Sequence, residues 1–209
     1  MDTEEKNDME SRIIEAAKVV FVRKGYEATK MGDVAAEAGI SRTALHYYFR
    51  TKEMLFNAIF GQLMGLLLPN IGIIMDEQST ILEKMPKIIE QYMVAIHKNP
   101  LFPIFVINEM NRDPEHLYRA VLKNSARIEP VLRLQQQILE EMDKGLIKKR
   151  PLAETASTLL SLIIFPLLIK NPLTTVFLEG DQEAYEKFLI DRKELILGVM
   201  YHLMAPDRN

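Results

Sequence analysis

The chain has 209 residues, of which 48% are apolar, and a net charge of −3 at pH 7. This length and apolar content suffice for one large domain or two small domains with a real core, and the weak negative charge excludes a polycation. The sequence contains no cysteine, which excludes disulfides and thiolate metal sites and leads us to expect the reducing environment of the cytoplasm.

A membrane-spanning helix is the first alternative to weigh. The segment Met54–Met75 contains no charged residue and has the Gly61-x-x-x-Gly65 spacing that is known from membrane helix dimers. Polar residues and Pro69 interrupt this segment, and a proline breaks or kinks a helix. The second apolar run, Thr155–Ile169, is shorter than the roughly 20 residues that a bilayer needs. We therefore expect a soluble protein that does not bind a membrane.

The N-terminal segment predicts one amphipathic helix. Asp8 can cap this helix, and Gly25 can end it in a conformation that costs glycine little. Its apolar residues recur at helical spacing and form one stripe: Ile13, Ala16, Ala17, Val20 and Phe21. We expect this helix to cover the segment that follows and to complete a three-helix core.

Two short helices joined by a glycine turn are predicted between Thr29 and Lys52. The apolar residues of Lys30–Ala38 fall on one helix face, and Gly39 suits the left-handed conformation that ends a helix. Ser41 can then cap the second helix by accepting a hydrogen bond through its hydroxyl oxygen.

The second of these helices has two different faces. Its apolar face consists of Leu45, Tyr48 and Phe49. Its opposite face carries cationic, hydroxyl and aromatic groups: Arg42, Thr43, His46 and Tyr47. No acidic residue lies between Glu37 and Glu53, so the segment is locally basic although the whole chain is not. These features are what a helix needs to enter a DNA major groove.

The order A-T-K-M-G-D-V-A-x-x-A-G-I-S-R-T-x-L-x-Y-Y-F-x-x-K-E-x-L, from Ala28 to Leu55, resembles the helix-turn-helix signature of the TetR family of transcriptional regulators. Two positions depart from the family pattern. The family commonly has Thr or Ser where Lys30 stands, and an aromatic residue, often Tyr, where His46 stands; both positions usually face the DNA.

The resemblance implies a helix-turn-helix DNA-binding domain over residues 1–50 and a ligand-binding and dimerisation domain over residues 51–209. It also implies a regulator, in most cases a repressor, that binds a near-palindromic double-stranded DNA operator as a homodimer and is released by a small-molecule effector. The residues predicted to contact DNA are Thr29, Lys30, Ser41, Arg42, Thr43, His46, Tyr47 and Lys52. Among them, Thr29 and Lys52 are expected to clamp the DNA backbone through a hydroxyl and an ammonium group.

The rest of the chain predicts six further helices. The first begins at Thr51 and ends near Leu68, because Pro69 and Gly72 follow. The others are expected at about residues 79–98, 101–112, 114–144, 151–169 and 182–205. Residues 170–181 are predicted as a loop that can hold one helical turn.

Two prolines complicate these predictions. Pro86 should kink the helix at 79–98 or mark its true start, and Pro130 should bend the helix at 114–144 or split it. No segment shows the alternation of a strand. The sequence therefore predicts an all-α fold with about nine helices.

An effector pocket and a dimer interface are predicted within the C-terminal helices. Apolar, aromatic and acidic residues that could line the pocket are Leu66, Tyr92, Phe102, Phe105 and Glu109, although such residue types also fill ordinary cores. Tyr92 or Glu109 could be the polar anchor for a hydrophobic or amphipathic effector. Glu109 is also placed for an ion pair with Arg112 within one helix.

The last two predicted helices have more apolar surface than one small bundle readily covers. We therefore expect them to form the homodimer interface through Leu160, Ile163, Ile164, Leu167, Leu195, Val199 and Leu203.

The sequence offers no support for catalysis. Its histidines lack metal-binding spacings, and it contains no nucleophile elbow, phosphate-binding loop or dinucleotide-binding motif. We therefore expect no enzyme, metal or cofactor. Two alternatives to an effector-controlled regulator remain. One is an architectural DNA-binding dimer without an effector, and the other is a helical small-molecule-binding protein with a vestigial helix-turn-helix.

Overall fold

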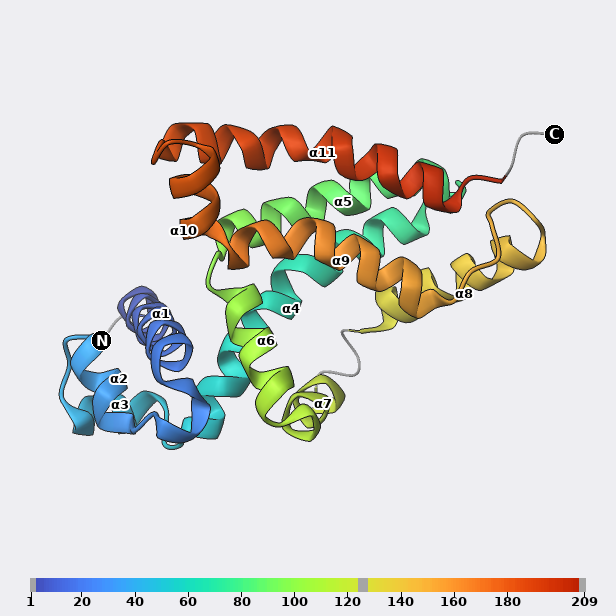
Figure 1. The fold of residues 1–209 in the computed structure, drawn as a ribbon. Coiled ribbons are helices and arrows are strands. Elements are labelled where there is room, and N and C mark those ends of the chain that lie inside the picture. The colour runs from blue at the N-terminus through green and yellow to red at the C-terminus, as the bar shows by residue number, and fades with distance from the viewer. Residues whose placement is uncertain (1–2, 124–127, 207–209) are drawn as a thin grey trace. The chain divides into compact units, whose positions relative to one another are not determined.

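A computed structural model describes residues 3–123 and 128–206, and all regular structure in them is helical (Figure 1). The predicted all-α fold is confirmed, with eleven α-helices and one π-helix in these residues in place of about nine helices. The chain divides into two compact units. Unit 1 comprises Met1–Leu66 and Asn99–Ala126, and unit 2 comprises Leu67–Lys98 and Arg127–Asn209. These units follow the packing of the chain, so the functional boundary predicted at residue 50 stays a prediction.

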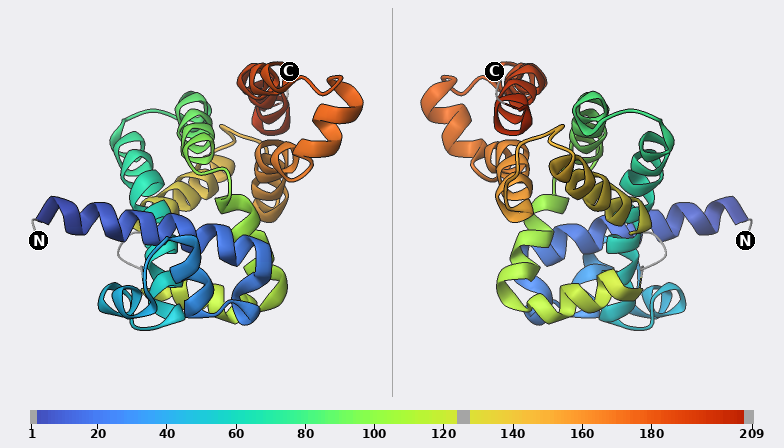
Figure 2. Two further views of the ribbon diagram at one scale, coloured as in Figure 1. Left: turned by 90° about the vertical axis from the view of Figure 1, so that its left-hand side faces the viewer. Right: turned by 90° about the vertical axis from the view of Figure 1, so that its right-hand side faces the viewer.

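Unit 1 contains the N-terminal helices and two helices from the middle of the chain. Its elements are α1 (Thr3–Ala28), α2 (Met31–Glu37), α3 (Arg42–Tyr48), the first part of α4 (Lys52–Asp76), α6 (Phe102–Arg112) and α7 (Pro114–Lys123). Helix α1 packs against α2 and α6, and α2 packs against α3 (Figure 2). Gly25 leaves the helical conformation with a φ of +76°, which interrupts α1 where the sequence predicted its end.

The core of unit 1 is rich in aromatic rings. The predicted stripe of α1 is buried in it, with Ile13, Ala17 and Val20 fully inaccessible to solvent. The phenylalanines of this core are Phe21, Phe49, Phe56, Phe60, Phe102 and Phe105. Burial of a large apolar side chain stabilises a fold by about 1.5–3 kcal/mol, so these contacts hold the three N-terminal helices against α4 and α6.

Unit 2 is built from the C-terminal helices. Its elements are the last part of α4, α5 (Ile81–Lys98), α8 (Glu129–Asp143), α9 (Leu152–Leu168), α10 (Lys170–Pro172), the π-helix η2 (Leu173–Phe177) and α11 (Gln182–Met204). Helices α9 and α11 lie side by side (Figure 1). The buried members of its main core cluster are all isoleucine or methionine: Ile81, Met85, Ile89, Ile96, Met142, Ile147, Ile163, Ile196, Met200 and Met204.

Helix α4 is longer than predicted. It continues through Pro69 and Gly72 to Asp76, whereas the sequence predicted an end near Leu68. A proline inside a helix costs about 3 kcal/mol or more. Ile71 and Ile74, which follow Pro69, are almost fully buried, and burial of two such side chains can offset that cost.

Two other prolines inside helices remove backbone donors that α11 replaces. Pro86 in α5 has no N–H for the carbonyl of Leu82, and this carbonyl accepts a hydrogen bond of 2.7 Å from the hydroxyl of Tyr201. Pro166 in α9 likewise leaves the carbonyl of Leu162, which accepts a bond of 2.9 Å from the Nη2 of Arg192. Thus Pro86 lies inside α5 and does not mark its start.

The remaining differences from the predicted helices are also local. The helix expected at 114–144 is two helices, α7 and α8, and residues 124–127 between them lie outside the described part of the chain. Pro130 stands in the first turn of α8, where its missing N–H has no intrahelical partner to lose. The predicted loop at 170–181 is more helical than expected, because it contains α10 and η2.

Among the described residues, only α4 is by itself long and apolar enough to cross a membrane. Helix α9 followed by α10 and η2 would count as a second candidate only if that pair, bent by 70°, formed one span. A core helix of a soluble protein passes the same test of length and composition. Leu55 and Phe56 of α4 are fully buried in the core of unit 1, so this helix has a role inside the protein.

Candidate nucleic-acid interface

Local hydrogen bonds fix the turn between α2 and α3. At the start of α2, the backbone N–H of Lys30 donates to Oδ2 of Asp33 over 2.9 Å. At its end, Gly39 has a φ of +68°, and the N–H of Ile40 donates to the carbonyl of Ala35 over 3.0 Å. Ser41 then caps α3 as predicted, because its Oγ accepts a bond of 3.1 Å from the N–H of Ala44.

Helix α3 is held by one face and leaves the other free. Leu45 is fully buried and Phe49, directly after the helix, is 8% exposed. Arg42, Thr43 and Tyr47 are exposed, and the Tyr47 side chain has 70% of its surface accessible. Arg42 forms no hydrogen bond or ion pair with any other described residue. His46, by contrast, is only half-exposed. The exposed face therefore offers donors that no partner in the described structure occupies.

The two predicted backbone clamps have structural partners in unit 1. Thr29 is 3% exposed, and its Oγ1 donates to the carbonyl of Gly25 over 2.7 Å. The Nζ of Lys52 donates to the carbonyls of Tyr26 and Glu27 over 2.7 and 3.1 Å, and it lies 4.3 Å from the centre of the Tyr26 ring. Both side chains donate to carbonyls at the end of α1, so they also hold the connection between α1 and the helix-turn-helix in place.

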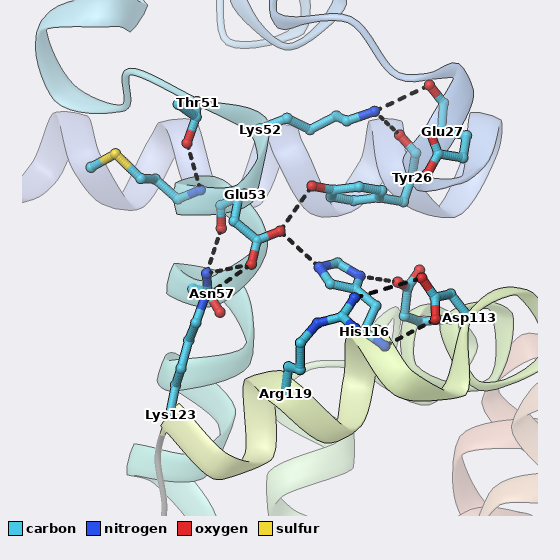
Figure 3. Close-up of polar contacts among 12 residues, drawn as sticks. Tyr26, Glu27, Thr51, Lys52, Glu53, Asn57, Asp113, His116, Arg119 and Lys123 are labelled. Atoms are coloured by element: carbon cyan, nitrogen blue, oxygen red, sulfur yellow. Dashed lines mark hydrogen bonds and ion pairs between the residues drawn. The ribbon is translucent and has the colours of Figure 1, made fainter.

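A polar cluster at the start of α4 was not predicted from the sequence (Figure 3). Glu53 accepts hydrogen bonds from the hydroxyl of Tyr26 over 3.0 Å, from Nδ2 of Asn57 over 3.0 Å and from Nζ of Lys123 over 3.2 Å. Its Oε2 also lies 2.7 Å from Nε2 of His116. Burial opposes the charge of Glu53, but these hydrogen bonds outweigh it and lower the pKa of Glu53 to about 2.

The cluster extends to α6 and back to α1. Glu109 is 3% exposed and binds both Arg112, as predicted, and Nδ1 of His116. Arg112 also donates from Nη1 to Glu27 over 2.7 Å. The sequence had shown Glu53 only as an acid in the first turn of a helix, and His116 only as a histidine without metal spacing. These two residues lie 63 positions apart in the chain, and no local pattern predicts that they come into contact.

Comparison with known proteins places the N-terminal segment in a family. Residues 13–59 match the family model described as bacterial regulatory proteins, tetR family. An uncharacterized helix-turn-helix-type transcriptional regulator of Bacillus subtilis, YfiR, is 46% identical over 56 residues, which is 27% of this chain and 27% of that protein. Residues 13–59 therefore form an N-terminal domain of the TetR family.

Two further TetR-related proteins extend the comparison. The fatty acid metabolism regulator protein of Bacillus subtilis is 27% identical over 81 residues, covering 39% of this chain and 42% of that protein. A crystal structure of a TetR family transcription regulator from Marinobacter aquaeolei covers 99% of this chain and all of its own, with a TM-score of 0.66 and 18% identity. This likeness shows the fold alone. The sequence matches span less than half of the length of either Bacillus relative.

The residues predicted for a TetR effector pocket fall into different units. Leu66, Phe102, Phe105 and Glu109 belong to unit 1, and Tyr92 belongs to unit 2. The two phenylalanines pack in the aromatic core, and Glu109 is bound by Arg112 and His116. Tyr92 packs against the core of unit 2, and its hydroxyl has no hydrogen-bond partner among the described residues. Of the two predicted polar anchors, Tyr92 alone is unoccupied.

The hollows found on unit 2 do not contain any predicted pocket residue. The larger, of about 430 Å³, is open and mainly polar, and its lining includes Glu83, Lys84 and Glu141. The second, of about 390 Å³, lies around Leu139, Met142 and Arg150. Neither is an enclosed apolar cavity of the kind that the sequence analysis expected.

The residues predicted for a TetR dimer interface differ in exposure. Leu160, Leu195 and Val199 are exposed, and Ile164, Leu167 and Leu203 are half-buried. Ile163 is only 6% exposed because it packs within the core of unit 2. The structure adds exposed apolar side chains on α9, η2 and α11, which the sequence analysis did not single out: Phe165, Leu168, Val176, Phe177 and Ile190.

Proposed function

We propose that this TetR-family protein is a transcriptional regulator, acting as a repressor, that inserts α3 into the major groove of a near-palindromic DNA operator. The observation that carries the proposal is the division of α3 into a buried face and an exposed one. Leu45 anchors the helix, while the guanidinium of Arg42 has no partner among the described residues. A free arginine on a groove-entering helix can bind a guanine edge through two hydrogen bonds.

The other predicted DNA contacts surround Arg42. Thr43, His46 and Tyr47 share its face of the helix, and Lys30 stands at the N-terminus of α2. Ser41 uses its hydroxyl to cap α3, so its contact with DNA would come from the backbone or from a second hydrogen bond of the same oxygen. We expect Lys30 and Lys52 to contribute to phosphate binding, which sets affinity without selecting sequence, and the buried Thr29 to act by holding the end of α1 in place.

The proposed regulator acts as a homodimer through α9, η2 and α11. Support comes from the exposed apolar residues of these elements, which include Phe165, Phe177 and Ile190 with more than half of their surface accessible. A monomeric soluble protein rarely exposes so many large apolar side chains together, and such surfaces mark protein–protein interfaces. Two copies would present two recognition helices to half-sites about 34–36 Å apart, or a multiple of that spacing. The expected compartment is the cytoplasm.

We infer that a hydrophobic or amphipathic effector binds in unit 2 and weakens operator binding. The core of unit 2 contains Met85, Met142 and Met200, and methionine side chains adapt to ligands of irregular shape. Burial raises the pKa of Tyr92 above its ordinary value, so its hydroxyl stays protonated as a donor for a ligand. The Bacillus relative named as a fatty acid metabolism regulator supports acyl chains as the first ligands to test.

The experiment that tests this function is a mobility shift with DNA from upstream of the chain's own gene, followed by titration with fatty acids and acyl esters. Specific binding that a ligand reverses supports an effector-controlled regulator, and Tyr92→Phe should then raise the ligand concentration needed. Specific binding that no ligand changes would favour an architectural dimer. The larger hollow described on unit 2, which is open and mainly polar, fits that second function. Ligand binding without any DNA binding would indicate a vestigial helix-turn-helix.

A further inference from the structure

His116 occupies a site in which carboxylates face both of its ring nitrogens. The side chain is 6% exposed and lies between the rings of Tyr26 and Phe56, with ring centres 4.7 and 4.2 Å away. Its Nε2 is 2.7 Å from a carboxylate oxygen of Glu53, and its Nδ1 contacts a carboxylate oxygen of Glu109. Ionised carboxylates only accept hydrogen bonds, so both ring nitrogens must donate. A neutral imidazole has only one N–H.

The charged ring can therefore donate to carboxylates on two other helices, and the neutral ring can donate to only one of them. Glu53 belongs to α4, Glu109 to α6 and His116 to α7. If Nε2 loses its proton, its lone pair faces Glu53 and the bond between α4 and α7 is lost. If Nδ1 loses its proton, the bond to Glu109 is lost, although Nδ1 could then accept from Nη2 of Arg112, 3.3 Å away. In either case one carboxylate loses a charge-assisted hydrogen bond.

The same cluster holds both connections of the helix-turn-helix to the rest of unit 1. Before α2, the chain is held at Tyr26, whose hydroxyl donates to Glu53, and at Glu27, which Arg112 binds. After α3, the chain is held at Lys52 and Glu53, the first residues of α4. Figure 3 shows Glu53 at the meeting point of Tyr26, Asn57 and His116.

Other charged groups of unit 1 surround the contact between Glu53 and His116. Helix α1 contributes Tyr26 and Glu27, α4 contributes Lys52 and Glu53, α6 contributes Glu109 and Arg112, and α7 contributes Arg119 and Lys123, while Asp113 stands between α6 and α7. Burial and the bond to Glu53 raise the pKa of Tyr26, so that hydroxyl remains a donor. Glu53 stays ionised, because its pKa is about 2.

We propose that His116, in its imidazolium form, is a positioning residue for DNA binding that keeps α2 and α3 in place through Glu53 and Glu109. This inference rests on the proposed DNA-binding function. The charged ring gains two carboxylate partners on folding, so the protonated form stabilises the folded arrangement. Loss of either ring proton removes one of these two bonds.

The test is a measurement of operator affinity from pH 5.5 to 8.5 at constant ionic strength. We expect wild type to bind about tenfold more weakly at the upper end, as when one hydrogen bond to a charged group is lost. Glu53→Gln should remove most of this dependence, because a carboxamide can donate to a neutral ring nitrogen, so this variant should keep its affinity at high pH. His46→Gln, which removes the histidine of α3, and His97→Gln on α5 are controls that should keep the dependence.

A second readout does not use DNA. Long-range proton–nitrogen NMR spectra of the histidine side chains should show both nitrogens of His116 protonated at pH 6, and His116→Gln assigns the signal. A neutral His116 ring across the whole range would overturn the proposal, and so would specific operator binding with one affinity at every pH. If no specific DNA binding occurs at any pH, the proposed function itself fails, while the NMR result still decides the charge of His116.

Discussion

Units 1 and 2 stabilise themselves with different kinds of side chain. The core of unit 1 combines phenylalanines such as Phe21, Phe56 and Phe105 with a buried polar cluster around Glu53 and His116. The main core cluster of unit 2 buries isoleucine and methionine only. Rings in close contact and charge-assisted hydrogen bonds have few alternative arrangements, whereas methionine has many. The difference fits the proposed division of function, in which DNA recognition by unit 1 needs one fixed geometry and ligand binding by unit 2 needs an adaptable interior.

The largest expected effect tests the apolar surface of unit 2. Leu195 is 54% exposed, and a charge there would be buried twice in a symmetric dimer. Leu195→Glu should therefore raise the dimer dissociation constant at least a hundredfold, which analytical ultracentrifugation can measure. Ile73→Glu is the matched control, because Ile73 is an exposed isoleucine on α4, outside α9–α11. A wild-type chain that sedimented as a monomer at every concentration would remove the proposed interface.

The next effect tests the exposed face of unit 1. Arg42→Ala should weaken operator binding by about 5–150-fold, because a bidentate contact with guanine is worth about 1–3 kcal/mol. Arg42→Lys keeps the charge but not the forked geometry, so it should retain affinity for unrelated DNA while losing discrimination at one base pair. Fluorescence anisotropy with operator and scrambled duplexes measures both properties. Equal operator affinity for all three proteins would mean that α3 does not contact bases through Arg42.

The smallest effect tests the prolines of unit 2. Tyr201→Phe removes the donor to the carbonyl of Leu82 and should lower the free energy of unfolding by about 1 kcal/mol. Pro86→Ala restores a backbone N–H to the same carbonyl, so the tyrosine substitution should cost less in that background. Thermal unfolding of the four proteins of this double-mutant cycle gives the coupling. Additive effects would show that the Tyr201 hydroxyl does not compensate for Pro86.

Local signals predicted the helix-turn-helix correctly. Gly39 adopts the expected left-handed conformation and Ser41 caps α3, because each depends on only a few neighbouring residues. Helix ends near prolines were harder to predict. The sequence placed the end of α4 before Pro69, since it could not show that Ile71 and Ile74 are buried beyond it.

The contacts between distant residues could not be predicted from the sequence. The sequence left Phe102 and Phe105 open between an ordinary core and a pocket wall, and the structure shows them packed in the core of unit 1. Glu53 and His116 meet across 63 residues, and no pattern in either segment indicates the other. A pattern of hydrophobic and polar residues shows which face of a helix is buried, but not which side chain from another helix lies opposite.

The prolines of α5 and α9 also bear on the order in which unit 2 folds. Tyr201 and Leu82 are separated by 119 residues, and Arg192 and Leu162 by 30. Neither α5 nor α9 can satisfy all of its carbonyls from its own backbone, so each reaches full stability only after α11 has docked. Contacts of such long range form late and slow a folding reaction. Docking of α11 would then be the step that makes the assembly of unit 2 cooperative, and chains arrested before it would retain α5 and α9 as loosely held helices.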